Sequence, residues 1–348
     1  MNGKVLVIGS NGFVGFSLVK RLMRLNFNVI AGISSPNSAY RVCTIPVEKV
    51  VIDITSYFNQ NIFKEVDYVI NCSTGSSKVI EEGTKNILNA CLKYKVKKYL
   101  HLSSVDVYGN LKGEIGENSL KNPKTPYGKS KLASEKICKE FIKKGLNITI
   151  LRPAIIYGED SELWVTRICK RVTDSNFKIS TKTKNSQCNL IHISDLTEIC
   201  IEALKNNKTS NKIYNITSEE KISWFRYYNF FKKELLRNEI QCTNHFKLRF
   251  KLLILDKIKF IALFFLKNFQ NLVLNVANST STVKNIFKKS QNVLTTNLNL
   301  NELDLVCREA FYSNDQFNKD FIYKLRFNSE KGITSSIKWY KSYFDFKK

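Results

Sequence analysis

The stretch KVLVIGSNGFVG, residues 4–15, determines the fold that we expect for this chain. Its first part is a short apolar run, as in a buried strand of a parallel sheet. Glycines follow at 9, 12 and 15, and a helical pattern then continues to about Leu25. Glycines at this spacing permit a tight turn and let a pyrophosphate approach the backbone, with the helix N-terminus facing the phosphates. We therefore interpret residues 9–15 as a dinucleotide-binding turn.

Strand and helix patterns alternate over the first 150 residues. Strands are predicted at 4–8, 28–33, 50–54, 67–72, 98–104 and 147–151, and helices at 13–25, 82–94 and 129–143. This alternation predicts an α/β fold with a doubly wound parallel sheet.

The end of the second predicted strand bears on the choice of cofactor. Ser34 and Ser35 stand where sites that bind NAD usually place an acid on the ribose 2′-hydroxyl. Small hydroxyls and Arg41 could instead accept a 2′-phosphate, so we expect NAD(P), with NADP favoured over NAD. Arg41 could equally be a surface charge. Asp53 could bind the adenine amino group or cap the next turn, and the residues leave both roles open.

The segment YLHLSSVDVYGNLKGEIGENSLKNPKTPYGKSK, residues 99–131, carries the predicted chemistry. Tyr127 and Lys131 lie one helical turn apart, on the same face of a predicted helix. A neighbouring ammonium stabilises a phenolate, so we expect Lys131 to lower the pKa of Tyr127 from its usual value of about 10. Such a tyrosine can exchange a proton with an alcohol or ketone, and Ser104 would hold the same oxygen. These residues predict a hydride-transfer site.

The composition limits the possible partners and the compartment. The 348 residues include 55 Lys+Arg and 30 Asp+Glu, a net charge of +25, which suits an anionic partner, although no long block of like charge stands out and the excess could be spread over the surface. Nine cysteines without a CxxC pair, and three histidines, predict reduced thiols, no metal site and a cytoplasmic location. The first residues run directly into a predicted strand, so no signal peptide is expected, and no apolar run reaches the ~18 residues of a spanning helix.

Eight segments together carry a family resemblance. They are GSNGFVG (9–15), Asp53-Ile54, DYVINC (67–72), EGTKNILNA (82–90), HLSSVDVYG (101–109), PYGKSK (126–131), LRPAIIYG (151–158) and NLIHISDL (189–196). In this order they resemble the extended short-chain dehydrogenase/reductase superfamily, in its UDP-galactose 4-epimerase-like, NAD-dependent epimerase/dehydratase branch. The resemblance implies a Rossmann domain at 1–160, to which a strand near 188–196 returns, and a smaller substrate-binding region at 161–348 that closes with a helix at 330–344.

The resemblance also implies roles for individual residues. Tyr127 would be the catalytic acid/base, Lys131 would bind the nicotinamide ribose, and Ser104 would orient the substrate, with Ser103 as the fallback. Cofactor contacts are expected from Gly9, Asn11, Gly12, Phe13, Val14, Gly15, Ser34, Arg41, Asp53, Ile54, Cys72, Ser73, Lys131 and Pro153. Substrate contacts are expected from Asp106, Arg152 and His192, although Asp106 could be a solvated turn residue and His192 a packed one.

The implied activity is that of an NAD(P)-dependent epimerase or ketoreductase acting on a sugar, expected to be nucleotide-linked, in a homodimer. Val105-Asp106 replaces the pair of acids found in sugar-nucleotide 4,6-dehydratases, which disfavours dehydration. Two alternatives are an oxidoreductase similar to 3β-hydroxysteroid dehydrogenases, acting on a lipid alcohol, and a non-catalytic dinucleotide sensor, against which Ser104, Tyr127 and Lys131 argue. Nucleic-acid binding is not expected, because no basic-aromatic stripe is present.

The segment FKLRFKLLILDKIKFIALFFLKNFQNLVLNV, residues 246–276, is apolar but punctuated by basic residues. Such a segment could lie in a membrane interface, with the basic side chains reaching lipid phosphates. The alternative, which the sequence favours, is a helical lid or a dimer face of the substrate-binding region.

Overall fold

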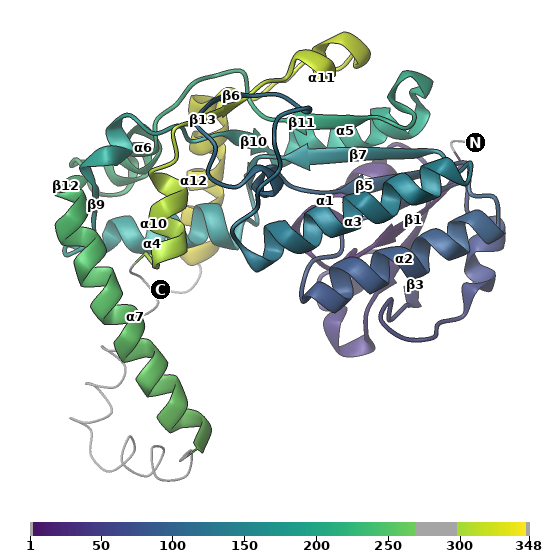
Figure 1. The fold of residues 1–348 in the computed structure, drawn as a ribbon, viewed down its shortest axis with the longest axis horizontal. Coiled ribbons are helices and arrows are strands. Elements are labelled where there is room, and N and C mark those ends of the chain that lie inside the picture. Colours follow the sequence, from purple (N-terminus) through teal and green to yellow (C-terminus); the bar gives the residue numbers. More distant parts are fainter. Residues whose placement is uncertain (1–2, 269–297, 346–348) are drawn as a thin grey trace. The chain divides into compact units, whose positions relative to one another are not determined.

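A seven-stranded parallel sheet forms the centre of the fold. The computed structural model describes residues 3–268 and 298–345. Its sheet has the strand order β11-β7-β5-β4-β1-β2-β3, and every neighbouring pair is parallel. The strands are β1 (Lys4–Ile8), β2 (Asn28–Ile33), β3 (Glu48–Val51), β4 (Tyr68–Asn71), β5 (Lys98–Leu102), β7 (Ile148–Pro153) and β11 (Ile213–Ile216) (Figure 1). The predicted doubly wound α/β fold is confirmed.

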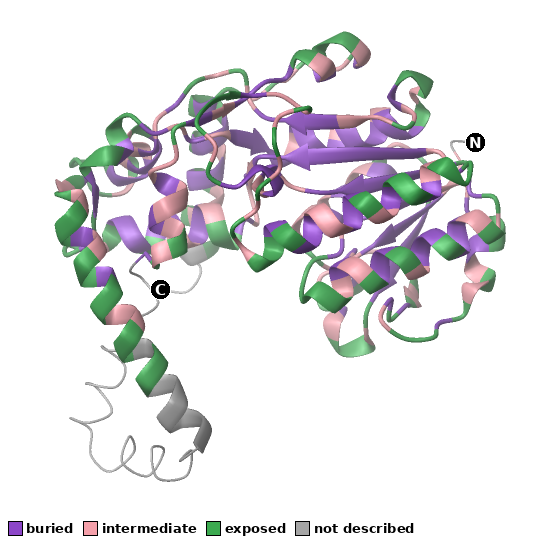
Figure 2. Ribbon diagram, in the orientation of Figure 1, coloured by how far each residue is buried: buried purple, intermediate pink, exposed green. Residues whose placement is uncertain are grey.

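Helices cover both faces of the sheet. On one face α1 (Phe13–Arg24) and α5 (Ile193–Lys205) enclose an apolar core, and on the other α2 (Ser77–Lys93) and α3 (Pro126–Lys143) enclose a second one. The central strands are buried on both sides, as Figure 2 shows in purple. Their continuous apolar runs follow from this double cover, because a strand between two helical layers has no side that faces water.

The order of the strands reverses between β1 and β4. Chain connections leave these neighbours in opposite directions, so their carboxyl ends open a crevice at which α/β proteins bind ligands. The glycine turn follows β1, and Ser73 lies just after β4. The sheet therefore places two of the predicted cofactor segments side by side.

The chain divides into two compact units. The first comprises Met1–Ser161, Asn189–Lys221 and Ala310–Ser336, and the second comprises Glu162–Cys188, Ile222–Glu309 and Ile337–Lys348. Besides the sheet, the first unit contains α11 (Asp315–Asp320) and two short parallel pairs, β6 (Gly113–Ile115) with β13 (Ala310–Tyr312) and β8 (Ile155–Tyr157) with β10 (Leu190–His192). The second contains α4 (Arg167–Thr173), α6 (Trp224–Leu236), α7 (His245–Asn268), α10 (Leu300–Val306) and the pair β9 (Lys178–Ser180) with β12 (Gln241–Thr243). Helix α12 (Ser329–Asp345) contributes residues to both.

The expected elements are present, but several bounds differ by a few residues: the helix expected at 82–94 begins at Ser77, and the strand expected at 98–104 ends at Leu102. The third strand was expected at 50–54 but spans Glu48–Val51, because Asp53 turns the chain before the sheet pairing can continue. The apolar-basic segment is helical through Asn268, and its remaining residues, 269–276, lie outside the described residues. Within the described ranges, no helix combines the length and hydropathy that crossing a bilayer requires.

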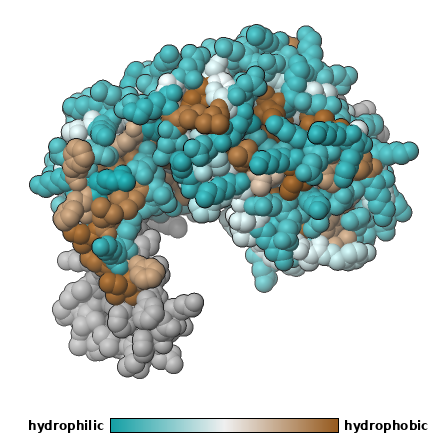
Figure 3. Space-filling model, in the orientation of Figure 1, coloured by the Kyte–Doolittle hydropathy of each residue, from teal (hydrophilic) through white to brown (hydrophobic). Residues whose placement is uncertain are grey.

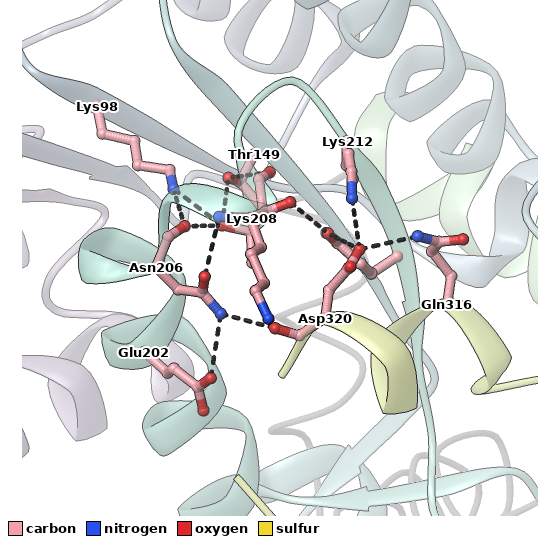
Figure 4. Close-up of polar contacts among 10 residues, drawn as sticks. Lys98, Thr149, Glu202, Asn206, Lys208, Lys212, Gln316 and Asp320 are labelled. Carbon is pink, nitrogen blue, oxygen red and sulfur yellow. Dashed lines mark hydrogen bonds and ion pairs between the residues drawn. The ribbon is translucent and has the colours of Figure 1, made fainter. Parts of the chain in front are cut away.

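The amino end of the sheet contains a buried lysine, Lys98. Its ammonium donates to the Asn206 carbonyl and to the Thr209 hydroxyl, each at 2.8 Å (Figure 4). The neighbouring carboxylate of Asp320 instead binds Lys212. Burial lowers the pKa of Lys98 from 10.5 to about 8. This network ties β5 to the loop after α5 with a desolvated cation.

We expect Lys98→Met to change how stability depends on pH. Between about pH 8 and 10.5 the unfolded chain holds the proton on Lys98 more tightly than the folded chain, so this group makes stability rise with pH. From about pH 7.5 to about pH 10, wild type should gain about 1–3 kcal/mol relative to the variant in urea unfolding. Lys93→Met, which removes an exposed lysine, should give a flat difference. A flat difference for Lys98→Met as well would contradict the lowered pKa.

Candidate active site

The glycine turn is shaped for close approach by a ligand. Gly9 has a positive φ of +74°, and a Cβ there would lie 3.1 Å from the Cys72 carbonyl group. A Cβ on Gly15 would overlap the Gly9 carbonyl oxygen. Helix α1 begins at Phe13, and its N-cap residue Gly12 makes no side-chain cap. The first N–H groups of α1, those of Phe13 and Val14 among them, therefore remain for an anion, which fits the pyrophosphate of a dinucleotide.

Asn11 links this turn to the segment after β2. Its side-chain oxygen accepts hydrogen bonds from the backbone of Arg41, at 2.7 Å, and of Val42, at 3.2 Å. The Arg41 guanidinium lies 5.8 Å from the ring centre of Tyr40, and its Nη1 atom is buried with no hydrogen-bond partner among the described residues. Ser34 is exposed at the end of β2. The structure thus places Ser34 and a buried guanidinium donor in the same connection.

Asp53 and Ile54 have structural partners of their own. The Asp53 carboxylate accepts hydrogen bonds from the Thr55 backbone N–H, at 2.9 Å, and the Thr55 hydroxyl, at 2.8 Å, and these bonds hold the pKa of Asp53 below its usual value. This is the capping alternative. Ile54 is buried against α2, where a Cβ on Gly83 would lie 2.5 Å from its Cδ1 atom. The adenine contact of Asp53 stays a prediction.

The residues at the end of β4 are uncharged and held by hydrogen bonds. The backbone N–H and the hydroxyl of Ser73 both donate to the side-chain oxygen of Asn71, at 3.0 and 2.7 Å. Burial raises the pKa of the Cys72 thiol to about 12, so this cysteine stays protonated at neutral pH. Pro153 lies buried as the last residue of β7. All three remain predicted cofactor contacts.

The three predicted catalytic residues come together where β5 ends. Ser104 follows β5, and Tyr127 and Lys131 lie in the first turns of α3. Ser104 makes a side-chain hydrogen bond to Tyr127, while the Lys131 ammonium lies 5.8 Å from the centre of the Tyr127 ring. Tyr127 is 39% exposed and can therefore be reached by a small molecule, whereas Lys131 is buried. Two hydroxyls thus share one site above a buried cation.

The expected lowering of the Tyr127 pKa is wrong for these residues as they stand. Although 39% of the residue is exposed, the protein groups packed around Tyr127 desolvate its phenol, and this effect together with the nearby Asp106 carboxylate raises the pKa of Tyr127 to about 12. The hydrogen bond with Ser104 only partly opposes them. The Lys131 ammonium donates instead to the backbone carbonyls of Leu102, at 2.7 Å, and Ser73, at 3.2 Å. Burial also lowers the pKa of Lys131 to about 8. Among the described residues, two carbonyls take two of its three donors, and the third could bind a ligand.

A bridge that the sequence reading missed holds the start of α3. The Thr125 hydroxyl accepts a hydrogen bond from the Gly128 N–H at 2.9 Å and donates a short one to the Asp106 carboxylate. A Cβ on Gly128 would lie 2.7 Å from the Asp106 carbonyl oxygen, so only glycine lets the helix come this close. Asp106 therefore braces α3, and its expected substrate contact has no support here. The Thr-Pro pair before Tyr127 is a helix-start signal that could have identified Thr125.

Arg152, an expected substrate contact, is buried and paired with another residue of the protein, and its contact with substrate stays a prediction. It is 1% exposed and forms a two-pronged ion pair with Glu135 of α3, at 2.8 Å from Nε and 2.7 Å from Nη2. Ser103, the fallback hydroxyl, is also buried and donates to Glu135 at 2.5 Å. Glu135 was missed, although it lies one turn beyond Lys131 on the same helix face.

His192 is likewise a packed residue. Its ring stacks on Phe327 with centroids 3.8 Å apart and meets Tyr157 edge-on at 5.2 Å. Burial, the largest effect, lowers its pKa, although Glu159 lies 3.6 Å from its Nε2 atom and opposes the shift. These contacts fit the alternative of a packed residue, and the expected substrate contact of His192 stays a prediction.

Comparison with known proteins agrees with this geometry. The model of the NAD dependent epimerase/dehydratase family matches residues 5–217, more than half of the chain. Among curated relatives, the N-acetyl-alpha-D-glucosaminyl-diphospho-ditrans,octacis-undecaprenol 4-epimerase of Escherichia coli O157:H7 is 28% identical over 62% of this chain and 67% of its own length. The UDP-glucose 4-epimerase of Vibrio cholerae is 23% identical over 64% of this chain and 73% of its own length.

A solved structure shares the fold over nearly the whole chain. The UDP-glucuronic acid 4-epimerase of Bacillus cereus, in complex with NAD, has a TM-score of 0.70 and covers 98% of this chain and 99% of its own. Its identity of 18% makes this a likeness of fold.

Proposed function

This chain belongs to the NAD dependent epimerase/dehydratase family, and from that premise we propose that it is an NAD(P)-dependent 4-epimerase of a sugar held on a diphosphate. The observation that carries the proposal is the pairing of the Ser104 and Tyr127 hydroxyls above the buried Lys131 ammonium. A bound dinucleotide would supply reversible hydride acceptance at a sugar carbon.

The three residues then have distinct tasks. Tyr127 takes the proton of the sugar hydroxyl as its carbon is oxidised, and gives it back to the same oxygen when the hydride returns to the other face. Ser104 hydrogen-bonds that oxygen in both stages. The third donor of Lys131 binds a ribose hydroxyl of the cofactor, which would bring its charge to bear on Tyr127. Together they invert one carbon without net oxidation.

The residues beside Ser104 favour epimerisation over dehydration. Val105 replaces one acid of the pair that follows the catalytic hydroxyl in dehydratases, and Asp106 is engaged with Thr125. The one acid of the pair that this chain keeps, Asp106, is therefore hydrogen-bonded to Thr125, the N-cap residue of α3, and a dehydratase would need both acids.

The proposed substrate class follows from what the relatives share. The E. coli relative acts, by its name, on a sugar joined through a diphosphate to a polyprenol, and the Vibrio relative on one joined to uridine. The sugar diphosphate is common to both, and the net charge of +25 suits such an anion. Nucleotide sugars are the first candidates.

We assign NADP as the preferred cofactor on the strength of Arg41. A 2′-phosphate would give its buried Nη1 donor the acceptor that it lacks among the described residues, and the exposed Ser34 could donate to the same group. Mass spectrometry of the denatured, freshly purified protein should release NADP(H) in excess of NAD(H). Release of NAD(H) alone would contradict this preference.

The activity is tested with the purified full chain and each cofactor. UDP-glucose, UDP-N-acetylglucosamine, UDP-glucuronic acid and N-acetylglucosaminyl-diphospho-polyprenol are incubated separately, and the products are analysed by proton NMR. We expect the 4-epimer of at least one substrate, with no net change in cofactor absorbance. When that substrate carries deuterium at C4, the product should retain it. Stoichiometric cofactor consumption would identify a reductase or dehydrogenase instead, and no conversion of any of them would overturn the proposal.

A further inference from the structure

Helix α7 presents apolar side chains on two opposite faces. One face packs within the second unit, where Leu248 and Leu252 are buried. The Arg249 guanidinium fixes this side through an ion pair of 2.6 Å with Asp304 of α10, and His245 lies 3.1 Å from the Ser180 hydroxyl. A helix held in this way needs apolar residues only on its inner face.

The outer face is apolar as well, and it is exposed. Seven of its side chains are between 42% and 75% exposed, namely Phe246, Phe250, Leu253, Ile254, Ile258, Phe260 and Ile261. Their positions, 246, 250, 253, 254, 258, 260 and 261, fall on one side of the helix and form a stripe over about four turns. Figure 3 shows these apolar side chains, in brown, gathered along α7. A surface of this kind marks a docking site.

Basic residues lie beside and within the stripe, and their charge indicates which kind of partner it binds. Lys247 and Lys251 are exposed along one border, and Lys257 is exposed within the stripe itself. From His245 to Asn268 the sequence contains one acid, Asp256, against six basic residues: Lys247, Arg249, Lys251, Lys257, Lys259 and Lys267. A matching partner has an apolar interior and negatively charged groups at its surface, and an anionic lipid bilayer has both.

We propose that the outer face of α7 docks on an anionic lipid surface, with the helix lying along the interface. Phe and Ile side chains would enter the acyl boundary, and the lysine ammonium groups would reach the phosphates. Lys257 separates this occupant from a second copy of the chain. In a dry dimer face its charge would be buried among Leu253, Ile254 and Ile261, whereas at a lipid surface its stem lies in the apolar layer and its charge stays solvated. The inference does not depend on the proposed function.

Vesicle flotation with the full chain tests the proposal. We expect the protein to float with vesicles of phosphatidylcholine and phosphatidylglycerol, and to remain unbound with phosphatidylcholine alone. Phe250→Asp with Ile254→Asp should reduce the bound fraction at least about tenfold, because two apolar side chains lose their burial. Lys247→Glu with Lys251→Glu should weaken binding most at low salt.

The controls separate the other occupants. Tyr57→Asp, a charge placed on an exposed aromatic of the first unit, should leave binding unchanged. All variants should keep the wild-type melting temperature, because each changes an exposed side chain. Sedimentation velocity without vesicles measures the oligomeric state of the wild-type protein and of each variant. The proposal would be overturned if the wild-type protein did not float with the anionic vesicles. It would also be overturned if Phe250→Asp with Ile254→Asp converted an oligomer into monomers without changing flotation, which would indicate a contact between copies of the chain.

Discussion

Replacing Tyr127 with Phe is expected to lower kcat about a thousandfold while the dissociation constant for the dinucleotide changes less than about threefold. The variant loses only the hydroxyl that exchanges the proton, and general acid–base catalysis is worth about 10²–10⁴ in rate. The ring that lies over Lys131 stays in place, so the cofactor side of the site is preserved. Steady-state epimerisation rates and dinucleotide titration by calorimetry measure the two quantities.

Ser104→Ala serves as the matched comparison for this prediction. It removes the hydrogen bond that lowers the pKa of Tyr127 but keeps the phenol, so the rate should fall less than in Tyr127→Phe. The limb of the rate profile on which the phenol must lose its proton should move to higher pH. An equal loss of rate and cofactor affinity in Tyr127→Phe, or a Ser104→Ala profile that moves to lower pH, would exclude the assigned roles.

Local patterns were enough to predict the sheet. The observed bounds of β1 and β2 are those expected, because each is a short apolar run closed by a turn within a few residues. The edge strand β3 was misplaced, since only one side of it is paired and its end depends on the Asp53 turn. Elements defined by their own residues were therefore predictable, and those defined by neighbours were not.

The site divides in the same way. Spacing within one helix brought Tyr127 and Lys131 together, and chain order placed Ser104 beside them. The predicted direction of the Tyr127 pKa shift was wrong, because the Lys131 ammonium donates to the backbone carbonyls of Ser73 and Leu102, which lie in other segments. Arg152 was expected to contact substrate because its segment resembles that of the family, and no pattern in that segment indicates its ion pair with Glu135 of α3.

That buried pair carries the second large effect, on stability. Glu135→Gln should lower the free energy of unfolding by about 3–5 kcal/mol, because it leaves the Arg152 charge desolvated without its counter-ion. Glu135 and Arg152 are each 1% exposed, and the Arg152 Nη1 atom also donates to Tyr108 at 2.7 Å and to the Glu117 carbonyl at 3.0 Å. The charge can neither move to water nor lose its proton. Urea unfolding followed by circular dichroism measures the change.

The double variant Glu135→Gln with Arg152→Met distinguishes an ion pair from ordinary packing. Removing both charges together removes the desolvated guanidinium, so stability should recover to within about 2 kcal/mol of wild type. The exposed pair of Lys233 and Glu239, at 2.9 Å, is the control, and Glu239→Gln should cost less than about 1 kcal/mol. If the double variant were as unstable as Glu135→Gln alone, shape and not charge would dominate at this position. Recovery instead means that Glu135 joins α3 to β7 because Arg152 must be neutralised there, which also anchors the helix that carries Tyr127 and Lys131.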